Sequence, residues 1–197
     1  MRCDPVLGAL VRRIGPCHLA RRAERDLFQV LLGTIVSQQL SAKASDTIYK
    51  RVVALVGGDP PDPAALLAVP VGRLREAGLS GRKAEYVHDL AARVTSGSLA
   101  LEHVQDVPDE EAIATLTTVR GIGRWSAEMV LIFRLLRPDV LPLDDVGLLN
   151  AAKKLYRLRT RPTPAKFTRM AEPWRPWRSV ACWYLWAALD NAPAESE

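Results

Sequence analysis

The stretch that decides the fold of this chain reads Leu116-Thr117-Thr118-Val119-Arg120-Gly121-Ile122-Gly123-Arg124-Trp125-Ser126. An amphipathic run at residues 109–116 precedes it, and an apolar run at residues 126–136 follows it. Two glycines one residue apart, Gly121 and Gly123, permit a turn too tight for a Cβ, and Ile122 between them can fill the gap beneath two helices. The pattern therefore predicts a helix, a tight turn and a second helix.

The turn also has the features of a phosphate-binding site. A helix begins with backbone N–H groups that have no partner within the helix, and these groups suit a phosphate. We expect the amides around Gly121 and Gly123 and the hydroxyl of Ser126 to contact phosphate, while Arg120 and Arg124 add positive charge. The pattern favours a helix–hairpin–helix, which clamps the DNA backbone without reading its sequence. The alternative is an ordinary corner between two helices with structural glycines.

Composition bounds the class of protein. The 197 residues are 48% hydrophobic and 25% charged, as in a globular protein, and the net charge of +5 weakly favours a polyanionic partner. Cys3, Cys17 and Cys182 have neither metal-ligand spacing nor a disulfide pattern, which indicates a reducing compartment without a zinc or iron–sulfur site. No signal peptide or bilayer-spanning stretch is evident, so we expect a cytoplasmic protein.

Apolar residues recur at helical spacing along the chain, and no β-hairpin or tandem repeat is evident. Ser41 and Asp62 are expected N-caps, the latter followed by Pro63. The sequence predicts an all-α architecture of about ten short helices. The expected helices cover approximately residues 5–14, 24–36, 42–56, 71–77, 81–94, 109–116, 126–136, 144–156, 164–172 and 176–189, and a further short helix is expected to start at residue 63.

Five stretches in a characteristic order carry a resemblance to a known family. They are residues 35–44, 74–84, 121–127, 141–145 and 174–179, joined by Trp186. Their order and spacing resemble the helix–hairpin–helix DNA glycosylase superfamily of the Gly/Pro-rich loop plus aspartate type (HhH-GPD). Within it the chain most resembles the alkylpurine branch, 3-methyladenine DNA glycosylase II.

The resemblance implies two helical subdomains that flank a cleft for DNA and the extruded base. One subdomain would combine residues 1–29 with 143–197, and the other would contain residues 30–142, with the helix–hairpin–helix at about 109–136. The enterobacterial form carries an N-terminal β-rich domain ahead of this core. Because this chain starts too late to contain it, we expect the compact, all-helical form.

The resemblance also implies the chemistry. Cleavage of an N-glycosidic bond builds positive charge on the sugar, which a carboxylate can stabilise while it orients water. The family aspartate corresponds to Asp145, while Asp144 is expected to cap the following helix; alternatively, both are only N-caps. Bifunctional glycosylase/lyases carry a Schiff-base lysine where this chain has Trp125, so a monofunctional hydrolase is implied. The alternative for Trp125 is a core aromatic.

Recognition of the base and of DNA is implied by further residues. Trp125 and Trp186 match aromatic pocket positions that would stack on a cationic alkylated purine, and Met129 replaces a tyrosine of the well-known relative. Gln39, with Gln38 beside it, would fill the gap left by the extruded nucleotide. The alternative is that both are loop glutamines before the helix that Ser41 caps.

Other charged and aromatic residues have expected roles of lower specificity. Lys43 or Arg82 would add to the attraction for phosphates, although Arg82 and Lys83 could equally form a solvated helix face. The three tryptophans outside the pocket are expected to pack in the core or between domains. They are Trp174, Trp177 and Trp183.

The implied function is base excision repair by removal of 3-methyladenine-type bases from double-stranded DNA. We expect a monomer in the bacterial cytoplasm, associated with the nucleoid through DNA. No cofactor or catalytic metal is implied, although hairpin carbonyls in this superfamily often hold a structural monovalent cation. The rival interpretations are a superfamily glycosylase with another base preference and a non-catalytic helix–hairpin–helix DNA-binding module.

Overall fold

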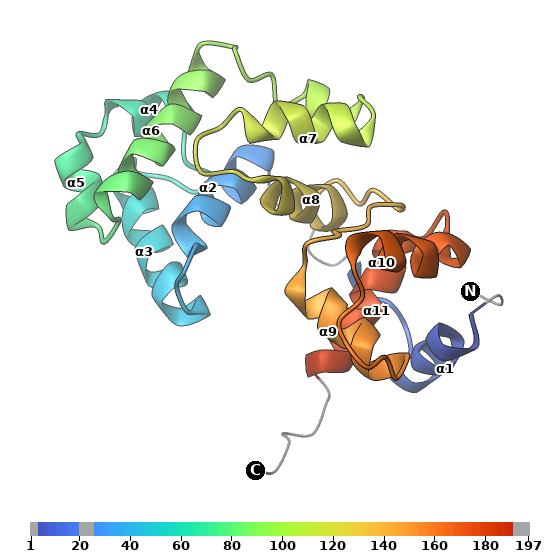
Figure 1. Cartoon of the computed structure of the whole chain (residues 1–197). Helices are drawn as coiled ribbons and strands as arrows, with labels where there is room; N and C mark the ends of the chain where they lie inside the picture. The colour runs from blue at the N-terminus through green and yellow to red at the C-terminus, as the bar shows by residue number, and fades with distance from the viewer. Residues whose placement is uncertain (1–3, 20–25, 191–197) are drawn as a thin grey trace. The chain divides into compact units, whose positions relative to one another are not determined.

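A computed structural model describes residues 4–19 and 26–190 of the chain (Figure 1). All regular structure within these residues is helical, which confirms the predicted all-α class. The helices match the expected ones closely, although the expected start of the second at residue 24 lies outside the described residues. They are α1 (Pro5–Ile14), α2 (Leu27–Ser37), α3 (Ala42–Ala54), α4 (Pro63–Ala68), α5 (Val71–Glu76), α6 (Gly81–Thr95), η2 (His103–Gln105), α7 (Asp109–Thr117), α8 (Arg124–Phe133), α9 (Val146–Leu155), α10 (Pro164–Ala171), η3 (Glu172–Trp174) and α11 (Arg178–Asp190).

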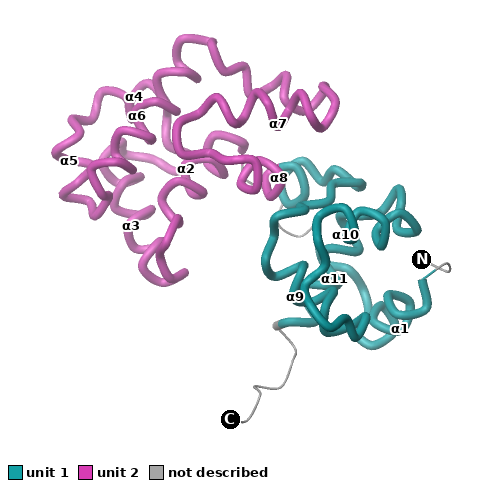
Figure 2. The backbone as a smooth tube through the Cα atoms, in the orientation of Figure 1, with its two compact units in different colours: residues 1–23, 131–197 teal, residues 24–130 magenta. Residues whose placement is uncertain are grey.

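The chain divides into two compact units (Figure 2). Unit 1 combines residues 1–23 with 131–197, and unit 2 is residues 24–130. Helix α8 begins in unit 2 and ends in unit 1. The expected boundaries, after residues 29 and 142, both lie further along the chain than these.

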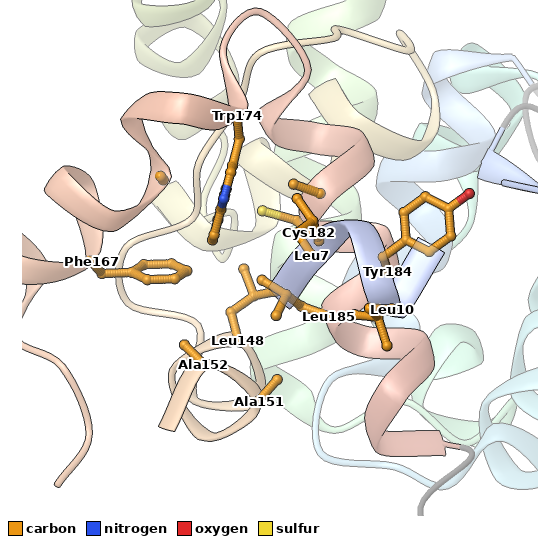
Figure 3. Close-up of a cluster of buried hydrophobic side chains, with 12 residues drawn as sticks. Leu7, Leu10, Leu148, Ala151, Ala152, Phe167, Trp174, Cys182, Tyr184 and Leu185 are labelled. Carbon is orange, nitrogen blue, oxygen red and sulfur yellow. The ribbon is translucent and has the colours of Figure 1, made fainter. Parts of the chain in front are cut away.

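Unit 1 is organised around α11, which packs against α9 and α1 (Figure 3). Each helix contributes apolar side chains at helical spacing to one cluster, and Phe167 of α10 meets the Trp174 ring edge-on, with 5.8 Å between centroids. The buried members are Leu7, Leu10, Leu148, Ala151, Ala152, Phe167, Ala171, Trp174, Ala181, Cys182, Tyr184 and Leu185.

A buried carboxylate fastens α1 to this cluster. Asp4 is the N-cap of α1, and its Oδ1 accepts the N–H of Leu7 at 3.0 Å. Its Oδ2 accepts the hydroxyl of Tyr156 at 2.5 Å and the indole N–H of Trp174 at 2.8 Å. Burial raises the pKa of Asp4, but the hydrogen bonds from Tyr156, Leu7 and Trp174 outweigh burial and hold the pKa below its ordinary value.

Unit 2 is organised around α6, against which α2, α4 and α5 pack. Helix α2 is apolar on most of its surface, while α6 buries one face. The helix starts follow local rules. Asp26 and Gln29 form a capping box on α2, and the expected N-caps Ser41 and Asp62 are confirmed on α3 and α4.

The tryptophans outside the site do not all behave as expected. Trp174 is fully buried and Trp183 packs against the unit 1 cluster, but Trp177 has 53% of its surface exposed. The prediction of a core role for Trp177 is therefore wrong, because this residue precedes α11 at a position that the cluster does not cover.

Among the helices of the described residues, none has the length and apolar character needed to cross a bilayer.

Candidate nucleic-acid interface and catalytic carboxylate

The predicted hairpin is present in the structure. Helix α7 ends at Thr117, residues 118–123 form the turn, and α8 starts at Arg124. Ile122 is buried beneath the turn, as expected. Gly121 has φ of +87°, and a Cβ there would lie 2.2 Å from the Tyr86 ring, so this position requires glycine.

Gly123 differs from the expectation. A Cβ added to Gly123 would meet no atom within 4 Å, and its backbone is not in the left-handed region. The prediction that the turn is too tight for a Cβ at both glycines is therefore correct for Gly121 and wrong for Gly123. The open space above Gly123 lies where the first turn of α8 presents its backbone amides.

The turn is fixed to α6 by a carboxylate. The N–H of Arg120 donates to Asp89 Oδ2 at 2.9 Å, and the same oxygen accepts from Arg93 Nε at 2.9 Å. Burial raises the pKa of Asp89, but these hydrogen bonds outweigh it and leave the pKa below its ordinary value. The guanidinium of Arg120 lies 5.9 Å from the Tyr86 ring centroid and 3.6 Å from Glu85, with more than half of the side chain exposed.

Arg124 contacts carboxylates rather than standing alone at the turn. Its guanidinium donates to both oxygens of Glu110 at 2.6 and 2.9 Å, and its Nε donates to Glu128 at 3.0 Å. The hydrogen bonds between Arg124 and Glu110 raise the pKa of the arginine and lower that of the glutamate. Arg124 therefore braces α7 against α8, and about half of its side chain remains exposed.

The loop of residues 38–41 connects α2 to α3, and it is called the insertion loop because it carries the glutamines expected to enter DNA. Gln38 is partly buried, and its Nε2 donates to the carbonyl of Gly121 at 2.7 Å. Gln39 is exposed and has φ of +57°, an uncommon conformation for a residue with a Cβ. Leu40 is 39% exposed beside it. Gln38 is thus attached to the hairpin, and Gln39 and Leu40 occupy the tip.

Lys83 is not part of a solvated helix face. Its Nζ donates to the carbonyls of Val36 at 2.8 Å and Gln38 at 2.5 Å, and burial lowers its pKa. Lys43 and Arg82 are exposed, as a role in long-range attraction requires. The alternative of a solvated helix face is therefore wrong for Lys83, because its side chain reaches the end of α2.

One face of α8 carries three large side chains one helical turn apart: Trp125, Met129 and Phe133. Trp125 is 49% exposed, which excludes the alternative of a core aromatic, and Met129 is partly buried. Phe133 was not predicted as a site residue, although its spacing of four residues from Met129 is visible in the sequence.

Asp145 is a buried carboxylate at the start of α9. It is only 7% exposed, and its Oδ1 accepts the N–H of Leu148 at 2.7 Å and the indole N–H of Trp186 at 3.2 Å. Asp145 is therefore the N-cap of α9, while Asp144 is exposed and precedes the cap. The prediction that Asp144 caps this helix is wrong, since the extended residue at the helix start is Asp145.

A carboxylate–guanidinium pair holds the connector that leads to Asp145. Asp139 accepts from Arg178 Nε at 2.6 Å and Nη2 at 3.0 Å, and from Arg175 Nη1 at 2.7 Å. The buried hydroxyl of Ser179 donates to the carbonyl of Arg137 at 2.6 Å. These contacts tie residues 137–140 to the start of α11, so the chain enters α9 from a fixed point.

Trp186 has a second neighbour besides Asp145. Its ring lies 5.4 Å from that of Phe133, and the two planes are tilted by 33°. A Cβ at Gly147 would lie 3.1 Å from Asp145 Oδ1 and 3.6 Å from Trp186, so glycine lets the first turn of α9 approach both groups. Unit 1 thus presents a buried carboxylate oriented by an indole N–H and a helix N-terminus, an arrangement suited to stabilising positive charge.

Comparisons with known proteins identify the family of the chain. A model of the family described as "HhH-GPD superfamily base excision DNA repair protein" matches residues 32–176. The chain is 30% identical over 186 residues to the alkylbase DNA glycosidase-like protein mag2 of Schizosaccharomyces pombe, and the match covers 93% of this chain and 87% of that protein.

Two solved structures are similar over nearly the whole chain. The DNA-3-methyladenine glycosidase of Bacillus halodurans has a TM-score of 0.88 at 38% identity, with 96% of this chain and 87% of that chain covered. The 3-methyladenine DNA glycosylase Mag1 of Schizosaccharomyces pombe, solved in complex with abasic DNA, has a TM-score of 0.80 at 32% identity, with 96% and 93% covered.

Proposed function

Because the chain belongs to the HhH-GPD superfamily of base excision DNA repair proteins, we propose that it is a monofunctional glycosylase for alkylated purines in double-stranded DNA. Relatives named as 3-methyladenine DNA glycosylases support the substrate class. The observation that carries the proposal is the carboxylate of Asp145. It is buried at the N-terminus of α9 and accepts a hydrogen bond from the indole N–H of Trp186.

Asp145 acts on the sugar. As the bond between C1′ and the base breaks, positive charge develops on the deoxyribose, and a negative charge held in a site with little water stabilises it strongly. The same carboxylate orients the water that adds to C1′. Trp186 and the N–H of Leu148 both bind Oδ1, so they fix the orientation of the carboxylate before the substrate arrives.

Trp125 supports hydrolysis rather than a lyase reaction. The position that carries a Schiff-base lysine in the superfamily's bifunctional members holds an indole here, which has no amine to attack C1′. The product is then an abasic site in an uncut strand. Lysines further along the chain, such as Lys153 and Lys154 in the last turn of α9, do not match that position.

The substrate base must leave the helical stack to be reached. N3- and N7-alkylated purines carry delocalised positive charge, which favours stacking on an aromatic face, and Trp125 in unit 2 and Trp186 in unit 1 each offer such a face. Met129 contributes an adaptable side chain, which suits a site that accepts more than one alkylated purine. Gln39 inserts into the gap that the extruded nucleotide leaves, and its exposed position at the tip of the insertion loop supports this role.

The hairpin holds the phosphates. The first turn of α8 presents backbone N–H donors together with the Ser126 hydroxyl. Gly123 leaves room for the DNA backbone to approach closely. Arg120 and Arg124 add charge whose effect weakens with salt. The protein acts on DNA as a monomer in the bacterial cytoplasm and needs no catalytic metal. Carbonyl groups of the turn would hold any structural monovalent cation.

Release of free bases from DNA treated with a methylating agent tests the proposal. Wild-type protein should release 3-methyladenine, and chromatography of the supernatant detects the base. Release of only oxidised or mismatched bases from matched substrates would favour the other branch of the superfamily. Binding to DNA without release of any base would instead identify a non-catalytic helix–hairpin–helix module.

A further inference from the structure

The insertion loop and the hairpin turn are joined through one lysine of α6. We propose that Lys83 is a positioning residue that fixes the insertion loop to the hairpin, so that Gln39 enters the duplex at a set distance from the clamped phosphates. The inference rests on the proposed function, in which both loops bind DNA. It assigns a role to a residue that contacts neither base nor sugar.

Lys83 donates hydrogen bonds to carbonyl groups at the C-terminal end of α2. This helix ends at Ser37, and the last carbonyls of any helix lack partners within it and attract positive charge. Nζ donates to the carbonyl of Val36 within the last turn and to that of Gln38 just beyond it. One ammonium group thus determines where α2 stops and the direction in which the chain leaves it.

The second half of the link is Gln38. Its carbonyl is held by Lys83 at 2.5 Å, and its side-chain Nε2 donates to the carbonyl of Gly121 at 2.7 Å. Lys83, Gln38 and Gly121 therefore form a continuous chain of hydrogen bonds from α6 through the insertion loop to the hairpin turn. Two further contacts of that turn also come from α6, since the Tyr86 ring covers Gly121 and Asp89 accepts the N–H of Arg120.

The backbone of Gln39 supports this role. Its φ of +57° is a conformation that persists in residues with a Cβ only where neighbouring contacts impose it. Gln38, the preceding residue, is held by both its carbonyl and its side chain, so the exposed Gln39 starts from a fixed point. A flexible loop would lose this orientation each time DNA was released.

The test compares Lys83→Met with Arg82→Met. Both variants lose one positive charge at the start of α6, but only Lys83 contacts α2. Affinity is measured by fluorescence anisotropy for a duplex with an abasic-site analogue and for an undamaged duplex. A 2-aminopurine beside the abasic site reports insertion.

The abasic preference is the ratio of the affinity for the abasic duplex to the affinity for the undamaged duplex. Lys83→Met should lower this ratio by about tenfold and abolish the 2-aminopurine response. The affinity of Lys83→Met for undamaged duplex should fall no further than the affinity of Arg82→Met does. Gln38→Ala should have a similar effect, and the double variant should be little worse than either single variant, because all three break one link. Gln38→Ala also covers the case in which Lys83→Met fails to fold.

An equal loss of preference in Arg82→Met and Lys83→Met would overturn the inference, as would independent, multiplicative effects of Lys83→Met and Gln38→Ala. Neither readout needs catalysis. A wild-type protein that prefers abasic DNA but releases no base would therefore refute the proposed function and leave this inference standing. A wild-type protein with no abasic preference would refute the inference itself.

Discussion

Replacement of Asp145 by asparagine separates the charge of this residue from its shape. Two hydrogen bonds to the carboxylate, from the N–H of Leu148 at 2.7 Å and the indole N–H of Trp186 at 3.2 Å, both go to Oδ1, which an amide oxygen can replace. Asparagine and aspartate are equally good N-caps. Each hydrogen bond to a neutral acceptor is weaker by roughly 1 kcal/mol, so we expect a loss of at most about 2 kcal/mol in the free energy of unfolding.

The effect on the reaction should be larger than the effect on folding. A positioned acid–base group contributes about 10²- to 10⁴-fold to the rate. At about 1.4 kcal/mol per tenfold, this corresponds to roughly 3–5 kcal/mol of transition-state stabilisation. Asp145→Asn should lose this contribution but bind damaged DNA at least as well as wild type, since it removes a negative charge near the phosphates.

The assay is single-turnover base release from methylated DNA with the protein in excess, alongside direct binding measurements. Asp144→Asn is the matched control, because Asp144 is exposed and lies outside the cap of α9. We expect it to react within about threefold of wild type, as for a surface change away from the site. If Asp145→Asn released base at the wild-type rate, or if Asp144→Asn were the slower variant, the catalytic assignment would be refuted.

Three further predictions concern the groups around this carboxylate, the hairpin and the core. Trp186→Phe keeps a ring but loses the N–H to Asp145, so turnover should fall by about tenfold with little change in binding, as single-turnover rates and anisotropy can show. Gly121→Ala should cost at least about 1 kcal/mol in urea unfolding and weaken binding to all duplexes, whereas Gly123→Ala should leave stability unchanged and weaken binding alone; equal stability losses would contradict the geometry. The folded pKa of Asp4 lies below its ordinary value of 3.8, so its stabilisation is present above that pH and is lost as the pH falls through the folded pKa. Asp4→Asn should be less stable at neutral pH and change less on acidification in urea titrations, and parallel pH profiles would disprove this.

The features that the sequence predicted correctly are local ones. The N-caps Ser41 and Asp62, the glycine required at position 121 and the buried Ile122 depend on a few neighbouring residues, whose identities are visible in the chain. The helices follow apolar spacing in the same way. The resemblance to a family then supplied the order of the elements, while the catalytic role that it implies for Asp145 stays a prediction.

The features that were missed depend on contacts between distant segments or on which of two adjacent residues begins a helix. Lys83 and Arg82 look alike in sequence, and only the packing of α6 against α2 distinguishes them. The ion pair of Arg124 was not predicted, because Glu110 lies on the other helix of the hairpin. The choice between Asp144 and Asp145 as N-cap depends on which residue ends the extended connector. Because both are aspartates, their identities do not distinguish them.

A labelled duplex with a single 3-methyladenine tests the central claim most directly. After incubation with the wild-type protein, half of each sample is treated with alkali and half is not, and strand breaks are measured on a denaturing gel. We expect breaks only after alkali and no protein–DNA adduct on borohydride reduction. Breaks without alkali together with a trapped adduct, or an intact strand after alkali, would contradict the claim.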